Sequence, residues 1–156
     1  MQDRPESSAI LQLEAFTPYR LLRAAEEVSR RFARHYKDRH GMTRPEWRTL
    51  ATIGQFDTIT AKQIGSHSSM HKTKISRAVR ALEQRRWLER STDEHDRRIE
   101  HLRLTRAGRR AYEELVEIAR GFERDLVGRV GSEGFGNLRL GLDAVEAMIH
   151  DGSRPR

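Results

Sequence analysis

Apolar residues recur along this chain with the spacing of amphipathic helices, interrupted once by the alternation that is typical of strands. From Pro18 to Asp38 they recur every three or four residues, which predicts a long helix that ends at Gly41. A second long helix is predicted over Thr105–Val127. Glycines follow it, and Ser132 is a candidate cap for a last helix from near Phe135 to His150. Both ends of the chain are therefore predicted to be long, apolar-striped helices.

Shorter helices are predicted between these two ends. Thr43, with Glu46 three residues later, has the spacing of a capping box before a helix whose buried side comprises Trp47, Leu50, Ala51, Ile53 and Gly54. A threonine cap opens another short helix over Thr60–Ser68, anchored by Ile64. The residues Ser68-Ser69-Met70 then form a turn into a further helix. Helix, turn and helix in this order is the arrangement in which the first helix supports the second in a DNA groove.

The helix after the turn has one apolar and one cationic face. Its apolar residues lie on one side at about 100° per residue: Ile75, Ala78, Val79 and Leu82. The opposite side carries Thr73, Ser76, Arg77 and Arg80. Small hydroxyls among arginines suit the major groove of B-DNA, which is about 12 Å wide and offers base edges and phosphates together. The alternative is a basic face that only contacts solvent.

A short hairpin is predicted directly after this helix. Leu88 and Arg90 precede a polar turn over residues 91–96, and Ile99–Arg103 alternate after it. The tip holds Arg97 and Arg98 beside Asp96, a carboxylate placed to orient a guanidinium by charge-assisted hydrogen bonds. An arginine on a thin loop can enter a narrow minor groove, where the phosphate field is strongest.

Helix, two-strand wing and the motif Asp96-x-Arg98, with Leu104-Thr105 after five further residues, resemble the MarR family of bacterial transcription regulators. The resemblance spans most of the chain, although Gly65 and Ser68 replace the small alanine and the apolar residue that are usual there. It implies a mainly α fold with a small β-wing. Residues 1–40 would form an N-terminal arm and dimerisation helix, residues 41–105 a winged helix-turn-helix lobe, and residues 106–156 the C-terminal dimerisation helices.

The family resemblance also implies a two-fold dimer. Its recognition helices would enter successive major grooves about 34 to 36 Å apart, so the operator should be a near-palindrome. We expect Thr73, Ser76 and Arg77 to contact base edges and Arg98 to enter the minor groove. The full set of expected DNA contacts is Lys72, Thr73, Lys74, Ser76, Arg77, Arg80, Asp96, Arg97 and Arg98.

A small-molecule effector is a further implication of the resemblance. MarR-type proteins commonly hold a small, often aromatic, anionic effector between the dimer helices and the DNA lobe. The candidate residues are His35, Tyr36, Trp47 and Arg48, and the alternative is that the aromatic ones belong to the core. The segments HKTKISRAV and RRIEHLRLT resemble regulators of hydroxycinnamate catabolism, which respond to aromatic acyl-CoA thioesters. Such an anion would suit the cationic first helix, which bears Arg20, Arg23, Arg30, Arg31 and Arg34.

Composition agrees with a polyanionic partner. Lys and Arg number 30 against 23 Asp and Glu, which gives a net charge of +7 over 156 residues and a pI near 10.5. No apolar run approaches the roughly 20 residues needed to span a bilayer, and the first ten residues lack an apolar signal region. The absence of cysteine removes disulfides and cysteine-based peroxide sensing, and we expect a cytoplasmic protein.

Other kinds of site find little support in the sequence. His67 and His71 stand four residues apart, but the predicted turn lies between them, so we expect no metal and no cofactor. Asp93, Glu94 and Asp96 share an exposed loop that buries nothing to shift a pKa, so we expect no enzyme and no catalytic residue. The expected function is an effector-responsive, sequence-specific repressor that acts as a homodimer. A nonspecific architectural DNA-binding protein is the main alternative, and an enzyme or interaction module is a third.

Overall fold

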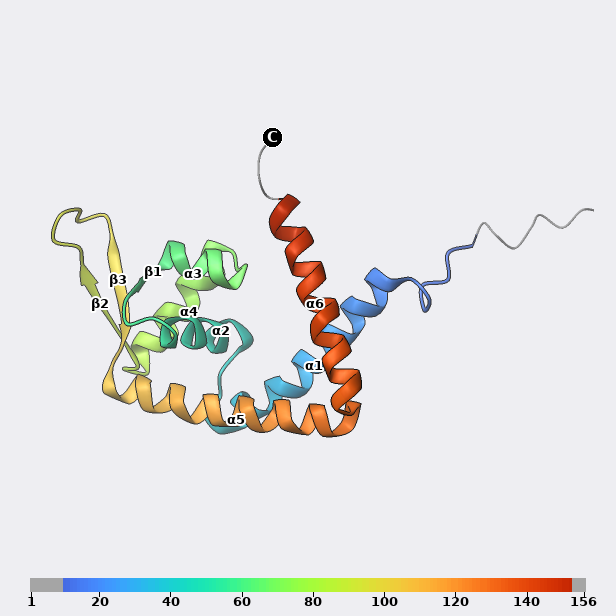
Figure 1. Cartoon of the computed structure of the whole chain (residues 1–156). Coiled ribbons are helices and arrows are strands. Elements are labelled where there is room, and N and C mark those ends of the chain that lie inside the picture. Colours follow the sequence, from blue (N-terminus) through green and yellow to red (C-terminus); the bar gives the residue numbers. More distant parts are fainter. Residues whose placement is uncertain (1–9, 153–156) are drawn as a thin grey trace, which may run out of the picture. The chain divides into compact units, whose positions relative to one another are not determined.

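The computed structural model describes residues 10–152 of the chain (Figure 1). The arm at residues 1–8, which the sequence predicts to be mobile, and the last four residues of the polar tail lie outside this part. The chain divides into two compact units, one up to Tyr112 and the other from Glu113 onward.

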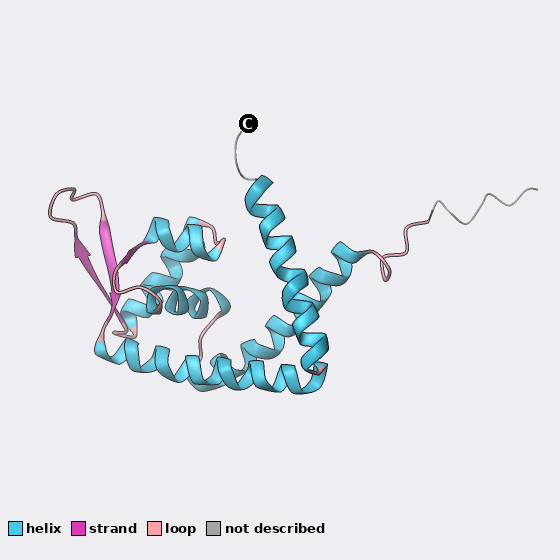
Figure 2. Ribbon diagram, in the orientation of Figure 1, coloured by secondary structure: helices cyan, strands magenta, loops and turns pink. Residues whose placement is uncertain are grey.

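The first unit combines helices with a small sheet, as predicted (Figure 2). Along the chain its elements are α1 (Thr17–His40), α2 (Arg44–Gly54), β1 (Ile59–Thr60), α3 (Ala61–Ser68), α4 (Lys72–Gln84), β2 (Leu88–Thr92) and β3 (Glu100–Leu104). Helix α5 (Arg106–Val130) begins in this unit and continues into the second, which also contains α6 (Ser132–Gly152). Within residues 10–152, no helix is both long and apolar enough to cross a membrane.

The sheet of the wing contains a third strand, β1, that was not predicted from the sequence. Strand β3 lies in the middle of an antiparallel sheet of order β1-β3-β2. On one side it pairs with β2, with Arg90 opposite Leu102. On the other it pairs with β1, where Ile59 lies opposite Leu102 and Thr60 opposite His101. Because Thr60 is also the N-cap of α3, the central wing strand is joined directly to the start of the helix-turn-helix.

The apolar stripe of α4 is buried, which confirms the predicted face. Ile75, Ala78, Val79 and Leu82 are each at most 3% exposed. They belong to a core that draws on α2, α3 and the sheet, with Leu50, Ile53, Ile64, Leu88 and Leu102 at most 4% exposed. The burial of one side of α4 leaves the opposite side free for a partner.

Local signals determine the helix ends as predicted. Gly41 has the left-handed conformation (φ 60°) that ends α1. At α2 the Thr43 hydroxyl accepts from the Glu46 amide, and the Glu46 carboxylate accepts from the Thr43 amide. Helix α3 has the same reciprocal arrangement between Thr60 and Gln63, in which the glutamine partner was not anticipated.

Hydrogen bonds and an ion pair of Arg85 connect the end of α1 to the rest of the first unit. Its guanidinium donates to the carbonyls of His40 at 2.7 Å and Gly41 at 3.1 Å. It also lies 3.5 Å from the Glu46 carboxylate and 5.2 Å from the centre of the Trp87 ring. A cation at the C-terminal carbonyls is favourable there because those groups carry partial negative charge.

The start of α5 packs directly against the backbone of Arg86 and Trp87, which precede strand β2 of the wing. The Thr105 hydroxyl donates to the Arg86 carbonyl at 2.7 Å and accepts from the Gly108 amide at 3.1 Å. Gly108 lies so close to Trp87 that a Cβ there would be 1.9 Å from the Trp87 carbonyl oxygen. The position therefore has no room for any side chain.

In the second unit, α6 begins earlier than predicted. Its first residue is Ser132, so the expected start near Phe135 is wrong and Ser132 is not a cap that precedes the helix. Gly131, with φ 84°, provides the break after α5. Helix α6 exposes a stripe of apolar side chains in the single chain: Leu138, Leu142, Val145 and Ile149.

Candidate nucleic-acid interface

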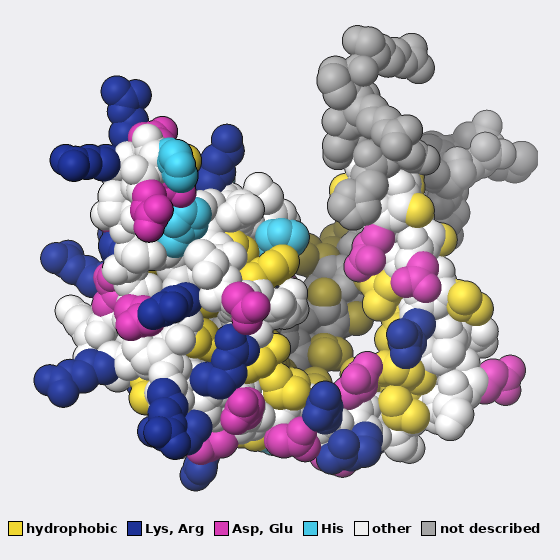
Figure 3. Space-filling view, turned by 60° about the vertical axis from the view of Figure 1, so that its left-hand side comes forward, with side chains coloured by type: hydrophobic (Ala, Val, Ile, Leu, Met, Phe, Trp, Pro, Cys, Tyr) yellow, Lys and Arg dark blue, Asp and Glu magenta, His cyan; other side chains and the backbone are white. Residues whose placement is uncertain are grey.

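The face of α4 opposite its buried stripe is cationic and accessible. All six α4 residues expected to contact DNA are exposed: Lys72, Thr73, Lys74, Ser76, Arg77 and Arg80. Within residues 10–152, no ion pair joins these lysines and arginines to a carboxylate. Their charge is therefore available to an external anion, and Ser76 and Thr73 place hydroxyls among them. Figure 3 shows Lys and Arg side chains projecting from several sides of the lobe.

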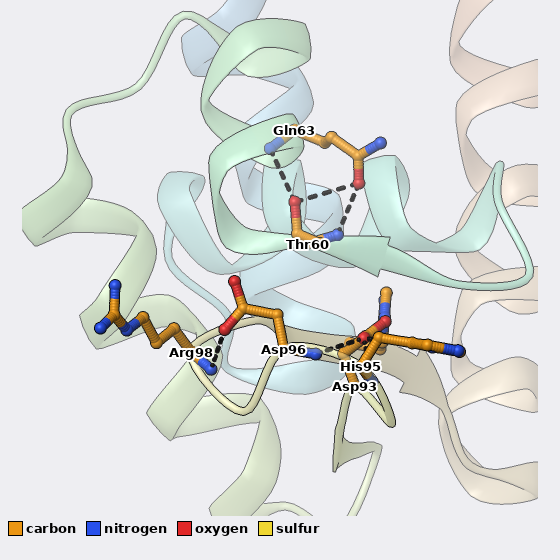
Figure 4. Close-up of polar contacts among 7 residues, drawn as sticks. Thr60, Gln63, Asp93, His95, Asp96 and Arg98 are labelled. Carbon is orange, nitrogen blue, oxygen red and sulfur yellow. Dashed lines mark hydrogen bonds and ion pairs between the residues drawn. The ribbon is translucent and has the colours of Figure 1, made fainter.

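The wing tip is held by aspartates that bind backbone amides (Figure 4). Asp93 Oδ1 accepts from the amides of His95 at 2.8 Å and Asp96 at 2.9 Å. Asp96 Oδ1 in turn accepts from the amide of Arg98 at 2.9 Å. The expectation that Asp96 orients a guanidinium is therefore wrong, because the contact that it makes is with the backbone. Arg98 extends its side chain away from the loop, and Arg97 is exposed as well.

The second oxygen of Asp93 binds an imidazole on β3. His101 Nε2 lies 2.8 Å from Asp93 Oδ2, and both side chains are half-buried. This bond, followed by the two backbone amides, lowers the pKa of Asp93 from 3.8 to about 2. Because the pKa of Asp93 is lower in the folded state, the ionised carboxylate stabilises the fold above pH 3.8. This stabilisation is lost as the pH falls through about 2. Asp93 is therefore ionised at every pH at which DNA binding is measured.

Arg90 joins the wing to α4. Its guanidinium binds both oxygens of Glu83 on α4, at 2.9 and 3.0 Å, and also Glu100 on β3. Two-pronged pairing of this kind restricts orientation as well as distance. Neighbouring Arg103 is paired with Glu89 across the strands and offers less free charge to DNA.

Loss of the Arg90 bridge should weaken DNA binding without unfolding the lobe. Because Arg90 is 38% exposed, the pair contributes only about 1 kcal/mol or less to stability. Glu83→Gln should therefore leave Tm almost unchanged but lower affinity for DNA several-fold, since the wing is less firmly oriented. Glu117→Gln, which breaks an exposed pair with Arg120, is the matched control. Equal binding by both variants would show that the bridge does not orient the wing.

The predicted effector residues fall into two groups. Tyr36 is 2% exposed and stacks on Trp47 with ring centres 5.8 Å apart, while Phe32 meets both rings edge-on. Burial raises the pKa of Tyr36, against the opposing effect of a hydrogen bond with Arg44, so the phenol is neutral. This packing favours the core alternative for Tyr36 and Trp47. His35 and Arg48 are exposed.

The arginines of α1 are less available than the sequence suggests. Arg31 and Arg30 both bind the Glu27 carboxylate, and these bonds lower the pKa of Glu27. Arg23 lies 5.8 Å from the centre of the Tyr19 ring. A large anion on this helix would have to compete with Glu27.

A cavity of about 560 Å³ lies between α3, α4 and the wing. Its apolar lining includes Ile75 and Leu102, and its polar lining includes Lys62, Lys72, Ser76, Arg90 and Glu100. Gly65 also lines it, and a Cβ there would come within 3.3 Å of the Ile75 side chain. The glycine that departs from the family pattern thus leaves open space beside α4.

The two histidines considered as metal ligands have other surroundings. The His67 ring lies 4.9 Å from that of Phe56, and His71 is the residue before the first turn of α4. Within the described residues, no group of three or more His, Cys, Asp or Glu side chains is arranged to hold a metal ion.

Fold and surface together define a winged helix-turn-helix protein. Residues 40–99 match the model of the MarR family. A MarR family transcriptional regulator from Silicibacter pomeroyi DSS-3 is 28% identical with a TM-score of 0.73, over 87% of this chain and 99% of that one. No curated protein matches the chain significantly.

Two further solved structures share the fold. A mutant MarR from E. coli complexed with operator DNA is 20% identical with a TM-score of 0.75, over 88% of this chain and 99% of that one. NadR in complex with 4-hydroxyphenylacetate is 20% identical with a TM-score of 0.68, over 91% and 97%. The fold is that of MarR family transcriptional regulators, and the family model matches the winged helix-turn-helix lobe.

Proposed function

We propose that the chain is an effector-responsive repressor that binds a near-palindromic operator as a homodimer. The observation that carries the proposal is the exposed cationic face of α4 next to a wing loop whose backbone is already ordered. A surface organised before binding loses less conformational entropy when the complex forms. Thr73, Ser76 and Arg77 would contact base edges, and Arg98 the minor groove. Lys72, Lys74, Arg80 and Arg97 would neutralise phosphates.

Operator binding and its salt dependence test this assignment. The probe is the DNA upstream of the protein's own gene, titrated in a fluorescence anisotropy assay with random duplex as competitor. About four phosphate contacts per subunit should give a slope of log affinity against log salt of about −7 for the dimer. Equal affinity for random duplex would support the architectural alternative, and no binding at low salt would exclude both DNA-binding functions.

The exposed stripe of α6 supports the proposed dimer. Leu138, Leu142 and Val145 recur at helical spacing, and each is 37 to 42% exposed in the single chain. An apolar stripe of this length on a terminal helix suits burial against a second copy. The proposed dimerisation role of residues 106–156 rests on this argument.

A charge in that stripe should separate the subunits. Leu142→Glu is expected to give a monomer in size-exclusion chromatography with light scattering, and affinity for the operator should fall about 100-fold, because one half-site alone is bound weakly. Asn137→Glu, at an exposed polar position of α6, is the control. Leu115 is unsuitable for this test because it is 0% exposed within one chain, so a charge there would disturb the fold. A Leu142→Glu monomer that still binds tightly would contradict the dimer.

The effector is proposed to be an aromatic acid or its CoA thioester. The complex of NadR with 4-hydroxyphenylacetate supports this class of ligand, and the cavity beside α4 has the volume of a small-molecule site. Its cations Lys62 and Lys72 would attract the acid, since Arg90 is already paired with Glu83 and Glu100. To release an operator, the effector must bind the conformation that does not fit DNA more tightly than the DNA-binding conformation, by several kcal/mol, on the order of 5.

Two variants, Lys62→Ala and Arg48→Ala, distinguish between the two candidate positions of the effector. A panel of aromatic acids and thioesters that includes 4-hydroxyphenylacetate is tested for release of the operator. If the effector occupies the cavity, Lys62→Ala lowers its potency and Arg48→Ala does not. The reverse result would place it beside the aromatic cluster of Tyr36 and Trp47.

A further inference from the structure

We propose that Asp93 and His101 are positioning residues that hold the wing loop in its DNA-binding conformation. The inference rests on the proposed role of Arg98 in the minor groove. It concerns how that arginine is presented, not whether it contacts DNA. Neither residue belongs to the expected DNA-contact set, and neither needs to touch DNA to act.

Asp93 uses its two carboxylate oxygens for different purposes. Oδ1 accepts from the amides of His95 and Asp96, which bends the chain into a turn. Oδ2 lies 2.8 Å from His101 Nε2. One side chain thus both shapes the loop and attaches it to β3.

The turn at Asp93 is continued to Arg98 by further hydrogen bonds. Asp96 Oδ1 accepts from the Arg98 amide at 2.9 Å, and the Asp96 carbonyl accepts from the Ile99 amide at 2.9 Å. The Asp93 amide donates to the Ile99 carbonyl, also at 2.9 Å, and closes the loop. The backbone beneath Arg98 is therefore ordered from both ends.

His101 connects this loop to the helix-turn-helix. It lies on the central strand, opposite Thr60 of β1 and Ser91 of β2. Thr60 is the N-cap of α3 and shares a reciprocal capping arrangement with Gln63 (Figure 4). A movement of the loop away from His101 would break its only side-chain attachment to the sheet among the described contacts.

The charged groups around the pair lie within the wing. Asp93 faces His101 directly, and His95 Nδ1 lies 4.0 Å from Asp93 Oδ1. Alternation along β3 places Arg103 on the same face as His101, but Arg103 is paired with Glu89 of β2. Because Asp93 is ionised, its contact with His101 is a charge-assisted hydrogen bond.

The experiment measures the operator affinity of full-length variants. Asp93→Ala removes the turn contacts and the contact with His101 and should weaken binding about tenfold, while Asp93→Asn keeps the turn and should lose only about threefold. His101→Ala removes only the contact with β3, whereas His101→Gln keeps a hydrogen-bond donor for Asp93 and should retain more affinity. His95→Gln is the matched control, because that side chain is 94% exposed, and it should bind the operator like the wild type.

A double variant distinguishes positioning from simple loss of stability. If Asp93 acts through Arg98, Asp93→Ala combined with Arg98→Ala should bind no more weakly than Arg98→Ala alone, with Tm nearly unchanged. Wild-type binding by Asp93→Ala, with weak binding by Arg98→Ala, would overturn this inference and leave the proposed function intact. Wild-type binding by Arg98→Ala would overturn the minor-groove role and the positioning inference together.

Discussion

Replacement of Gly108 by alanine should lower the stability of the fold by about 3 kcal/mol or more and Tm by about 10 °C. The added Cβ would lie 1.9 Å from the carbonyl oxygen of Trp87, which is backbone and cannot rotate away. That carbonyl already accepts from the Thr105 amide at 3.0 Å, so both segments are held where they meet. Thermal unfolding followed by circular dichroism measures the effect.

Gly128→Ala provides the control for this change, because Gly128 lies in the same helix with nothing within 4 Å of its added Cβ. It should be neutral or stabilise the protein by up to about 1 kcal/mol, as alanine favours a helix over glycine. If Gly108→Ala were as stable as Gly128→Ala, the close packing of α5 on the wing junction would be contradicted.

Replacement of Arg77 and Arg98 together by alanine should abolish measurable operator binding while the dimer and the fold remain intact. Arg77 is exposed on the cationic face of α4, and Arg98 extends from the ordered loop. A base-reading arginine contributes about 1 to 3 kcal/mol, so each single variant should lose about 5- to 150-fold in affinity. Anisotropy titrations with operator and random duplex measure both affinity and discrimination.

The two single variants should change DNA binding in different ways. Arg77→Ala should bind operator and random duplex more equally, because it loses a base contact, whereas Arg98→Ala should also reduce the salt slope. Arg129→Ala removes an exposed arginine from the end of α5 and serves as the control. Should the double variant bind like the control, α4 and the wing would not be the DNA-binding surface.

Features that depend on local sequence could be predicted well. The stripe Ile75, Val79 and Leu82 is visible because helical periodicity lies within one element, and the burial of all three follows from it. The cap at Thr43 and the end at Gly41 were predictable for the same reason. Glycine is a weaker signal, since only Gly131 marks the boundary between α5 and α6, while Gly128 and Gly134 lie inside helices.

Features that depend on strand register could not be predicted. Strand β1 has two residues, too few to show alternation, and its pairing with β3 spans some forty residues of chain. The contacts of Asp93 with His101 and of Arg90 with Glu100 depend on the register of the hairpin, and that of Arg90 with Glu83 depends on the position of the wing beside α4. The position of Asp96 beside arginine in the sequence suggested that its carboxylate binds a guanidinium. In the structure the carboxylate instead accepts from the Arg98 backbone amide.

Hydroxyl-radical footprinting of the operator tests most directly whether two copies of this cationic surface bind DNA in register. We predict two symmetric protected regions whose centres are about 10 base pairs apart, or one helical turn, with protection of the flanking minor grooves lost in Arg98→Ala. A single protected region, or uniform protection along the duplex, would contradict the paired arrangement on which the proposed regulation depends.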